Sequence, residues 1–268
     1  MKRRINKIKL FANDNETAQG VIKELEKRLL ENDFMLVSDN PDLAIAVGGD
    51  GSFLRMVKKN NFNSAILYVG VNAGTLGFLQ EIKITDLDLL IECLNTNNYK
   101  IGELGIQETT IVTNQGEEKY YSLNEILIRE RDLNTVILNI NVDGARLEKY
   151  VGDGVLIATS IGSTAYNLSF GGSIVFNSFH TLQITPIAPL NNKVYRNLLN
   201  SLIVPENVTI EITPEPSKPG LLVSIDGDNK IYQEVRAIKT VVNNKRIKCL
   251  RLEDYNFFEK INDKFLSK

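Results

Sequence analysis

The spacing of apolar residues changes near residue 105 and divides the chain into two parts. In the first part, continuous apolar runs alternate with segments in which apolar residues recur every three or four positions. The run at 43–47 is typical of a strand in a parallel sheet, and the spacing of Val21, Leu25 and Leu29 is typical of a helix. The pattern predicts strands at 8–12, 43–47 and 65–71, helices at 17–31, 52–59 and 85–94, and a glycine-containing loop at 72–79.

The second part has short runs rich in Val, Ile, Thr and Tyr, separated by turn signals such as Asp143-Gly144 and Asp226-Gly227. Such runs predict antiparallel strands. They fall at 108–113, 120–128, 136–142, 155–159, 208–213, 221–225 and 231–242. We therefore expect an α/β plus β protein, with a Rossmann-like α/β domain at 1–104 and a mostly antiparallel β domain at 105–249.

The C-terminal tail has its own helical pattern. Its apolar residues Phe257, Phe258, Ile261 and Phe265 need a partner surface. We expect the segment from about 250 to 268 to pack back on the first domain.

Composition excludes several classes of protein. Lys and Arg number 31 against 33 Asp and Glu, so the basic excess of a nucleic-acid-binding protein is missing. No window approaches the ~20 apolar residues of a membrane span, and no basic amphipathic helix is found. The one histidine, His180, rules out a His-rich zinc site. Cys93 and Cys249 form no CxxC pair, and without a signal peptide we expect reduced thiols in a cytoplasmic protein.

The first candidate site is the sequence Gly48-Gly49-Asp50-Gly51, between a predicted strand and a predicted helix. Glycines there let phosphate oxygens approach the backbone at the positive end of a helix dipole. Asp50 would repel phosphate unless it binds a metal ion or takes a proton from a nucleophilic hydroxyl. The alternative is a plain strand-to-helix turn with a capping Asp. No Gly-Lys dipeptide and no G-x-G-x-x-G occur, so the common nucleotide-binding loops are absent.

Two further features lie in the β region. Asn124-Glu125 interrupts an apolar run, and the pair could share a ligand only at a strand end or bulge, or else lies on an exposed edge. Residues 154–192 carry no Asp, Glu, Lys or Arg. This stretch is either a buried strand-and-turn core or a site where backbone and small hydroxyls approach a ligand. Within it a small-residue turn precedes a helix predicted to start at Ser163 or Thr164, and Asp153 is the charge just before the stretch.

Together these motifs resemble the bacterial NAD kinases. The resemblance rests on Gly48 to Gly51, Asn-X-Gly-X-Leu-Gly-Phe at 72–78, Asn124-Glu125, Asp153-Gly154, Gly-Ser-Thr-Ala-Tyr at 162–166, 185–189 and 224–227. It implies a phosphotransferase that phosphorylates the 2′-hydroxyl of the adenosine ribose of NAD, from ATP or polyphosphate, to give NADP. It also implies a divalent ion, Mg²⁺ or Mn²⁺, that bridges the donor phosphates, and a homodimer or homotetramer that binds neither nucleic acid nor membrane.

The resemblance also implies roles for single residues. Asp50 would be the general base, and Gly48, Gly49 and Gly51 would support phosphates. The residues that would bind NAD are Asp50, Gly51, Arg55, Phe78, Asn124, Glu125, Asp153, Thr164, Ala165, Tyr166, Asn167, Leu168, Ser169 and Ala188. The chain departs from the family pattern at Ser160 and Ile161, where relatives have Pro and Thr, and at 149–152, where many carry an Arg. No protein metal ligand is implied.

Two other functions stay open on the residues alone. A lipid kinase shares the first motif, but it would need a lipid groove and leaves the motif at 162–166 unexplained. A dinucleotide sensor without catalysis would keep the binding residues and could dispense with Asp50.

Overall fold

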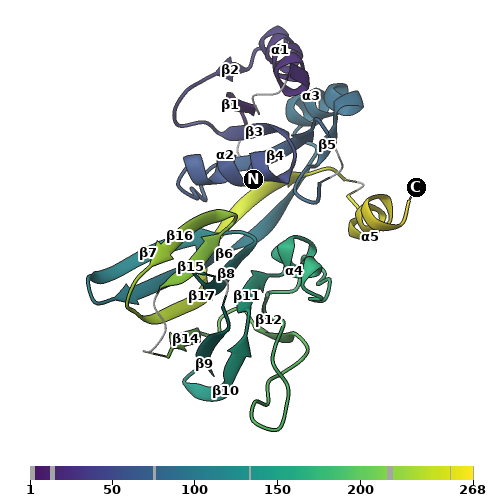
Figure 1. Ribbon diagram of the computed structural model, residues 1–268. Coiled ribbons are helices and arrows are strands. Elements are labelled where there is room, and N and C mark those ends of the chain that lie inside the picture. The colour runs from purple at the N-terminus through teal and green to yellow at the C-terminus, as the bar shows by residue number, and fades with distance from the viewer. Residues whose placement is uncertain are drawn as a thin grey trace. The chain divides into compact units, whose positions relative to one another are not determined.

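The computed structural model describes residues 4–12, 16–74, 77–132, 134–215, 220–253 and 255–267. The chain forms two compact units, the first made of Met1–Leu104 with Arg246–Lys268 and the second of Gly105–Lys245. Two long strands, β6 (Lys100–Thr113) and β17 (Val235–Arg251), carry the chain out of the first unit and back into it (Figure 1). Part of the predicted loop at 72–79, residues 75 and 76, lies outside the described residues.

The first unit is built on a parallel sheet with the strand order β2-β1-β3-β4-β5. The C-terminal part of β17 adds to β4 in parallel, with Lys248 opposite Leu67. The strands are β1 (Lys7–Ala12), β2 (Met35–Leu36), β3 (Leu43–Gly48), β4 (Leu67–Asn72) and β5 (Ile82–Lys83). β3 lies in the middle and is buried along its whole length, as its continuous apolar run predicts.

Helices cover both faces of this sheet. α1 (Glu16–Glu31) and α3 (Leu87–Thr96), which follows a 3₁₀ turn at Ile84–Asp86, share one apolar core with alternate residues of β3 and β4. α2 (Asp50–Lys59) packs on the opposite face, where its Phe53 ring lies 6.4 Å from the Tyr68 ring of β4. All six predicted elements of this region are confirmed, with ends displaced by no more than two residues.

The second unit has two antiparallel sheets with one apolar core between them. One sheet has the order β10-β9-β14-β17-β6-β7 and the other β13-β12-β11-β8-β15-β16. Their strands, besides β6 and β17, are β7 (Gly116–Ser122), β8 (Glu125–Glu130), β9 (Val136–Val142), β10 (Ala145–Gly152), β11 (Gly154–Thr159), β12 (Thr181–Ile187), β13 (Leu202–Pro205), β14 (Ile210–Pro214), β15 (Leu221–Ile225) and β16 (Asp228–Tyr232).

Two predicted strands are wrong as single elements. The run 120–128 is split into β7 and β8, because the backbone N–H groups of Leu123, Asn124 and Glu125 donate to the carboxylate of Asp226. The run 231–242 is split between β16 and β17 by a turn in which Glu234 has a φ of 51°. β10 was missed because its outward positions are charged, and β12 and β13 because their turn-rich surroundings hide the alternation.

The helix predicted from Ser163 or Thr164 is also wrong. A 3₁₀ turn at Gly162–Thr164 is followed by one α-helical turn, α4 (Tyr166–Ser169), and Ala165 between them has a non-helical backbone with a φ of −94° and a ψ of −136°. The hydroxyl groups of Ser163 and Thr164 donate to the carbonyls of Ser160 and Ile161, which competes with a continuous helix.

The C-terminal tail forms α5 (Phe257–Ile261) and a π-helical turn at Asn262–Leu266. The Phe257 and Phe265 rings pack against the Phe78 ring, with centroids 6.1 and 5.5 Å away, so the tail lies on the loop after β4. Of the helices in the described ranges, none is long and apolar enough to cross a membrane.

Candidate active site

The first group of candidate residues lies at the carboxyl end of the parallel sheet. Gly48, the last residue of β3, is paired with Asn72, the last residue of β4. The loops that follow the two strands therefore begin side by side. This is the edge at which open α/β sheets bind ligands. Gly48 has a φ of 145°, which only glycine adopts without strain, so the chain can turn sharply into α2.

Asp50 is the first residue of α2, and its carboxylate binds the neighbouring loop. Oδ2 accepts the backbone N–H of Phe78 and Oδ1 that of Leu79, each at 2.9 Å. The cap position belongs to Gly49, and no side chain caps the helix. The alternative of a plain turn with a capping Asp is therefore wrong, because this carboxylate is used across the chain.

The loop at 77–80 and the segment after β3 make further contacts. The Gln80 amide donates through Nε2 to the carbonyl of Gly49 at 2.7 Å. A Cβ on Gly77 would lie 2.1 Å from Oδ1 of Asp50, so the close approach of carboxylate and loop needs a glycine there. Gly49, by contrast, has no heavy atom within 4 Å of a built Cβ, and this leaves its surface open.

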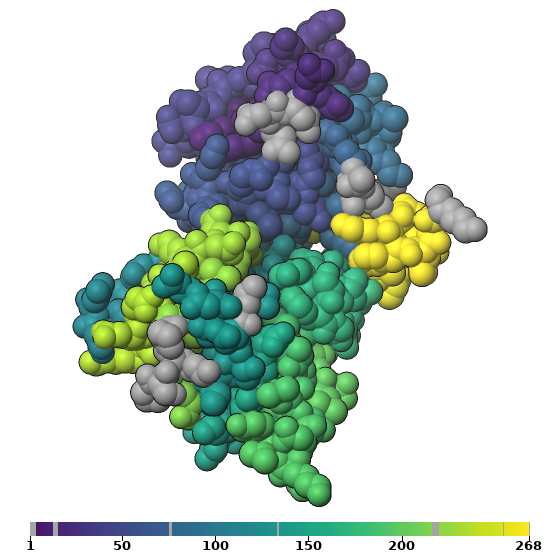
Figure 2. All heavy atoms as spheres, viewed as in Figure 1, coloured from purple at the N-terminus to yellow at the C-terminus, as the bar shows by residue number. Residues whose placement is uncertain are grey.

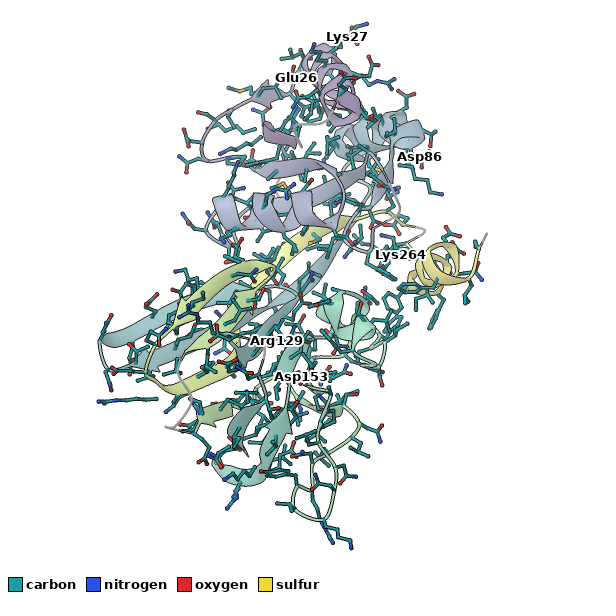
Figure 3. The ribbon with its side chains drawn as sticks, viewed as in Figure 1. Glu26, Lys27, Asp86, Arg129, Asp153 and Lys264 are labelled. Carbon is teal, nitrogen blue, oxygen red and sulfur yellow. The ribbon has the colours of Figure 1, made fainter. Side chains whose placement is uncertain are left out.

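The C-terminal segment supplies positive charge to this group. Nζ of Lys264 lies 3.9 Å from Oδ2 of Asp50 and 5.1 Å from the centre of the Phe78 ring, and Figure 3 shows this lysine on the C-terminal segment. Lys260 donates to the carbonyl of Gln80 at 2.5 Å and lies 3.4 Å from the Glu81 carboxylate. Sequence analysis missed both lysines, since no motif links the tail to residues 78–81.

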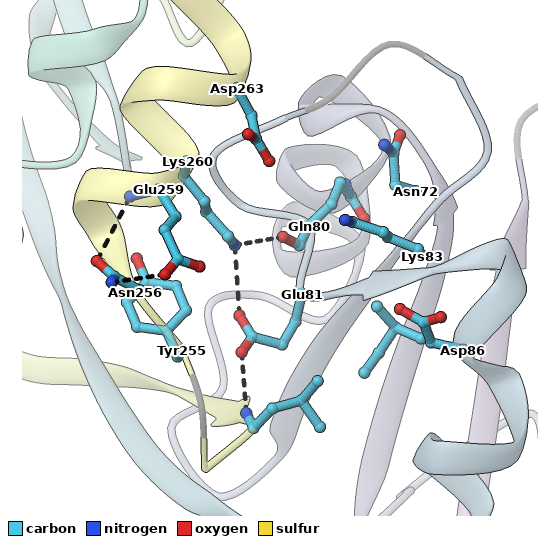
Figure 4. Close-up of a pocket in the computed structure, with 12 residues that line it drawn as sticks. Asn72, Gln80, Glu81, Lys83, Asp86, Tyr255, Asn256, Glu259, Lys260 and Asp263 are labelled. Carbon is cyan, nitrogen blue, oxygen red and sulfur yellow. Dashed lines mark hydrogen bonds and ion pairs between the residues drawn. The ribbon is translucent and has the colours of Figure 1, made fainter. Parts of the chain in front are cut away.

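A small pocket of about 160 Å³ opens beside these residues (Figure 4). Its lining combines lysines, carboxylates and amides, among them Gln80, whose Oε1 is buried without a hydrogen-bond partner. Arg55 lies on the other side of Asp50 along α2, where its guanidinium donates to the Ser52 hydroxyl at 3.2 Å.

The second group of candidate residues belongs to the second unit. Asn124 and Glu125 stand at the start of β8 and are only 8% exposed, so the exposed-edge alternative is wrong. Their backbone N–H groups, with that of Leu123, donate to Asp226 at 2.8 to 3.2 Å. Asp226 has a φ of 46° in the turn after β15. The turn signal Asp226-Gly227 thus has a second use that its sequence did not reveal.

Glu125 is a buried carboxyl group with an unusual environment. Its Oε2 has no hydrogen-bond partner, while the backbone N–H of Tyr166 donates to the side chain. Burial, together with the nearby negative charge of Asp226, raises the pKa of Glu125 from 4.5 to about 8, although the N–H of Tyr166 lowers it. The side chain therefore carries a proton at neutral pH.

The turn at 160–169 mixes structural and accessible residues. Ser163 and Asn167 are fully buried, and their side chains join the turn to Val175 and Thr185. Tyr166 and Ser169 are exposed, and the Tyr166 ring packs edge-on to Phe170 at 4.7 Å. Thr164, Ala165 and Leu168 are partly exposed. Of the candidates here, Asn167 is placed to support the turn, and Tyr166 presents its ring outward.

Asp153 and Ala188 lie at the opposite end of β11 from this turn. Gly154 pairs with Ile187 of β12 and Arg129 of β8, while Ala158 pairs with Glu125 (Figure 3). At about 3.3 Å per residue, the length of β11 separates the two ends by roughly 20 Å. Within one chain, Asp153 and Ala188 are therefore not brought together with Glu125 and Tyr166.

The uncharged stretch at 154–192 is buried in one part and exposed in another. β11 and much of β12 are buried core, as the simpler interpretation had it. Several large apolar side chains of the second half of the stretch and of the segment that follows, up to residue 203, are exposed instead, and Figure 2 shows this region in green at the surface of the second unit. They are Ile174, Phe179, Leu190, Val194, Tyr195, Leu198, Leu199 and Ile203.

Comparison with known proteins identifies the family models that match this chain. The model described as the ATP-NAD kinase N-terminal domain matches residues 35–99, and the one for the C-terminal domain matches 123–249. An NAD kinase of Finegoldia magna is 37% identical, with 97% of each chain covered, and one of Streptococcus pneumoniae strain 70585 is 32% identical, with 99% of this chain and 98% of that one covered.

Solved structures share the fold at lower identity. Yeast NADH kinase complexed with NADH superposes with a TM-score of 0.87 at 22% identity, over 100% of this chain and 90% of the other. An NAD kinase from Archaeoglobus fulgidus in complex with ATP superposes with a TM-score of 0.78 at 22% identity, over 96% of this chain and 99% of that one.

The raised pKa of Glu125 makes stability depend on pH. Between about pH 4.5 and 8 the folded chain keeps a proton that the unfolded chain releases, so the free energy of unfolding falls as pH rises through this window. At pH 7 the free energy of unfolding is about 3 kcal/mol lower than below pH 4.5 because of this group. Glu125→Gln removes this pH dependence. Urea unfolding at pH 5 and pH 8 measures it, with the exposed Glu117→Gln as control. An equal pH dependence in both variants would contradict the assignment.

Proposed function

Because the chain belongs to the NAD kinase family and phosphorylates NAD, we propose that Asp50 is the general base that activates the 2′-hydroxyl of the adenosine ribose, with ATP as the phosphoryl donor. The observation that supports this most directly is the carboxylate of Asp50. It stands at the carboxyl end of the parallel sheet, and two backbone N–H groups fix its direction.

The reaction needs little from the protein beyond position and charge. The 2′-oxygen attacks the γ-phosphorus while its proton passes to Asp50, the bond from that phosphorus to the β-bridging oxygen breaks, and ADP leaves. The products are NADP and ADP. Gly49 and Gly51 leave the backbone at the start of α2 accessible, and the first-turn N–H groups of a helix favour anions. We assign Gly48, Gly49 and Gly51 to phosphate support and Arg55 to ligand contact on this basis.

We assign NAD recognition in the second unit to the start of β8 and to the turn at 160–169. Asn124 and Glu125 supply buried polar groups, and a protonated Glu125 can donate a hydrogen bond where a carboxylate could only accept one. Tyr166 offers an exposed ring to a base or ribose. The resemblance implies further NAD contacts in this unit at Asp153, Thr164, Ala165, Asn167, Leu168, Ser169 and Ala188, and in the first unit at Gly51, Arg55 and Phe78.

The divalent ion enters with the donor as part of the substrate MgATP. In the described residues no three His, Cys, Asp or Glu side chains gather into a metal site. Both Asp50 oxygens are engaged by N–H groups, and His180 lies apart, 3.4 Å from Glu206. This donor set fits Mg²⁺ or Mn²⁺ held by phosphate oxygens and water. When bound, the ion offsets the negative charge of the transferred group.

Three further proposals follow from the fold. The parallel order β2-β1-β3-β4-β5 with helices on both faces supports a Rossmann-like class for the first unit. Cys93 and Cys249 are buried and form no CxxC pair, which suits a reducing compartment and supports a cytoplasmic location. The exposed apolar side chains between 174 and 203 support a homodimer or homotetramer.

Asp50→Asn should lower kcat by about 10²–10⁴-fold while NAD still binds, because the variant lacks the proton acceptor. NADP formation from NAD and MgATP measures the rate, and isothermal titration measures binding. Asp39→Asn, on the exposed surface of the same unit, serves as the control. Turnover near that of the unmodified enzyme would remove Asp50 from the role of base.

Tyr166→Ala should weaken NAD binding by about 1–3 kcal/mol, because it removes the exposed ring on which a base can stack. The affinity for a non-hydrolysable ATP analogue should stay the same. Titration with each ligand separates the two effects, and Tyr121→Ala on β7 controls for the loss of an exposed ring. An equal loss for both ligands, or none for NAD, would exclude the turn from the NAD site.

Leu199→Asp should shift the oligomer toward smaller species, since a charge in a buried contact loses its hydration. Light scattering after gel filtration measures the mass of the assembly. Ile231→Asp, equally exposed but on β16, should leave it unchanged. A monomeric unmodified chain would refute the proposed oligomer.

A further inference from the structure

The C-terminal segment contacts the Asp50-binding loop through a buried charged cluster, all within the first unit. The cluster consists of Glu81, Arg251 and Lys260, whose side chains are 2%, 9% and 14% exposed. Figure 4 shows Lys260 between the carbonyl of Gln80 and the carboxylate of Glu81. Its ammonium group also lies over the Tyr255 ring, 4.7 Å from the centroid.

Lys260 is not needed to neutralise Glu81. Nη1 of Arg251 lies 2.8 Å from Oε2 of Glu81, and Oε1 of Glu81 accepts the N–H of Leu252 at 2.9 Å. Lys260 is a second cation in the same low-dielectric space, and burial lowers its pKa to about 8. Burying an extra ammonium group is unfavourable, so we look for the role of Lys260 in a contact other than its ion pair with Glu81.

The shortest contact of Lys260 is the one to the carbonyl of Gln80, at 2.5 Å against 3.4 Å to Glu81. Gln80 directly follows Phe78 and Leu79, whose N–H groups orient the Asp50 carboxylate. The Gln80 side chain also binds the carbonyl of Gly49, which precedes Asp50. By binding the carbonyl of Gln80, Lys260 thus fixes the segment 78–80, which contacts the carboxylate of Asp50 and the carbonyl of the preceding Gly49.

We propose that Lys260 is a positioning residue for Asp50: by holding the carbonyl of Gln80, it keeps the N–H groups of Phe78 and Leu79 where they aim the carboxylate at the substrate hydroxyl. The inference rests on the proposed role of Asp50 as the general base. Displacements of about 1 Å in such arrangements reduce rates by as much as about 10²-fold.

The test is a double-mutant cycle on the full-length enzyme, with kcat and the KM values for NAD and MgATP as readouts. Lys260→Met keeps the apolar stem and removes the donor, and Glu81 keeps Arg251 and the Leu252 N–H, so the variant should fold. We expect kcat to fall about 10- to 100-fold with both KM values within threefold. In the Asp50→Asn background the same substitution should change kcat less than threefold, because no base is left to aim.

Lys100→Met is the matched control. This lysine also binds the C-terminal segment through a carbonyl and a carboxylate, both of Glu253, but it does not contact the loop at 78–81. It should leave kcat within twofold. A loss of kcat in Lys260→Met that is equal in both backgrounds, or that Lys100→Met reproduces, would overturn the positioning role.

The failure of this proposal can be told from a failure of the base assignment. If Asp50→Asn turns over normally, the base assignment falls and the positioning role falls with it. If Asp50→Asn is impaired and Lys260→Met is not, only the positioning role falls. Should Lys260→Met fail to fold, Lys260→Gln tests the same contact, because it replaces the ammonium group by a shorter neutral amide and leaves Glu81 paired with Arg251. The same non-additive loss of kcat is expected, and additivity would refute it.

Discussion

A carboxylate that accepts backbone N–H groups organises each unit of this chain. In the first unit Asp50 binds the N–H groups of Phe78 and Leu79, and in the second Asp226 binds those of Leu123, Asn124 and Glu125. Hydrogen bonds to an ionised acceptor are roughly twice as strong as neutral ones, so one side chain can order a loop that has no regular structure. The residues that we propose to bind or react stand on those loops or next to them.

Local periodicity predicts the strands and helices of the first unit well. In the second unit it predicts most strands but not where they break. β3 and α2 are specified by their own residues, since a buried parallel strand needs a continuous apolar run and a helix needs one apolar stripe. The break between β7 and β8 is specified from outside, by Asp226 a hundred residues away. The helix predicted from Ser163 or Thr164 is interrupted before α4, where the two hydroxyls bind the carbonyls of Ser160 and Ile161. Interactions of these kinds leave no periodic trace in the sequence.

The site shows the same division. Asp50 stood out because a carboxylate in a glycine-rich phosphate loop needs a function, and Asn124 and Glu125 because polar residues inside an apolar run need a partner. Glu81, Lys260 and Lys264 did not, because a charged residue in a loop or tail usually faces solvent. Only the fold shows that the tail crosses the loop after β4, where Lys264 comes within 3.9 Å of Asp50. The sequence could predict that the tail needed a surface, but it could not identify the charges that the tail carries there.

The glycines of the motifs differ in whether the packing of the chain itself requires them. A Cβ at Gly77 would collide with the Asp50 carboxylate, and one at Gly162 would lie 2.0 Å from the carbonyl of Asn124. Those glycines are required by the chain's own packing, whatever ligand is bound. Gly49 has no neighbour within 4 Å of a Cβ, so packing does not require a glycine there. In sequence the three look alike. Gly77 and Gly162 are thus explained by the packing of their own loops, whereas Gly49 is left for the phosphate contact that we propose.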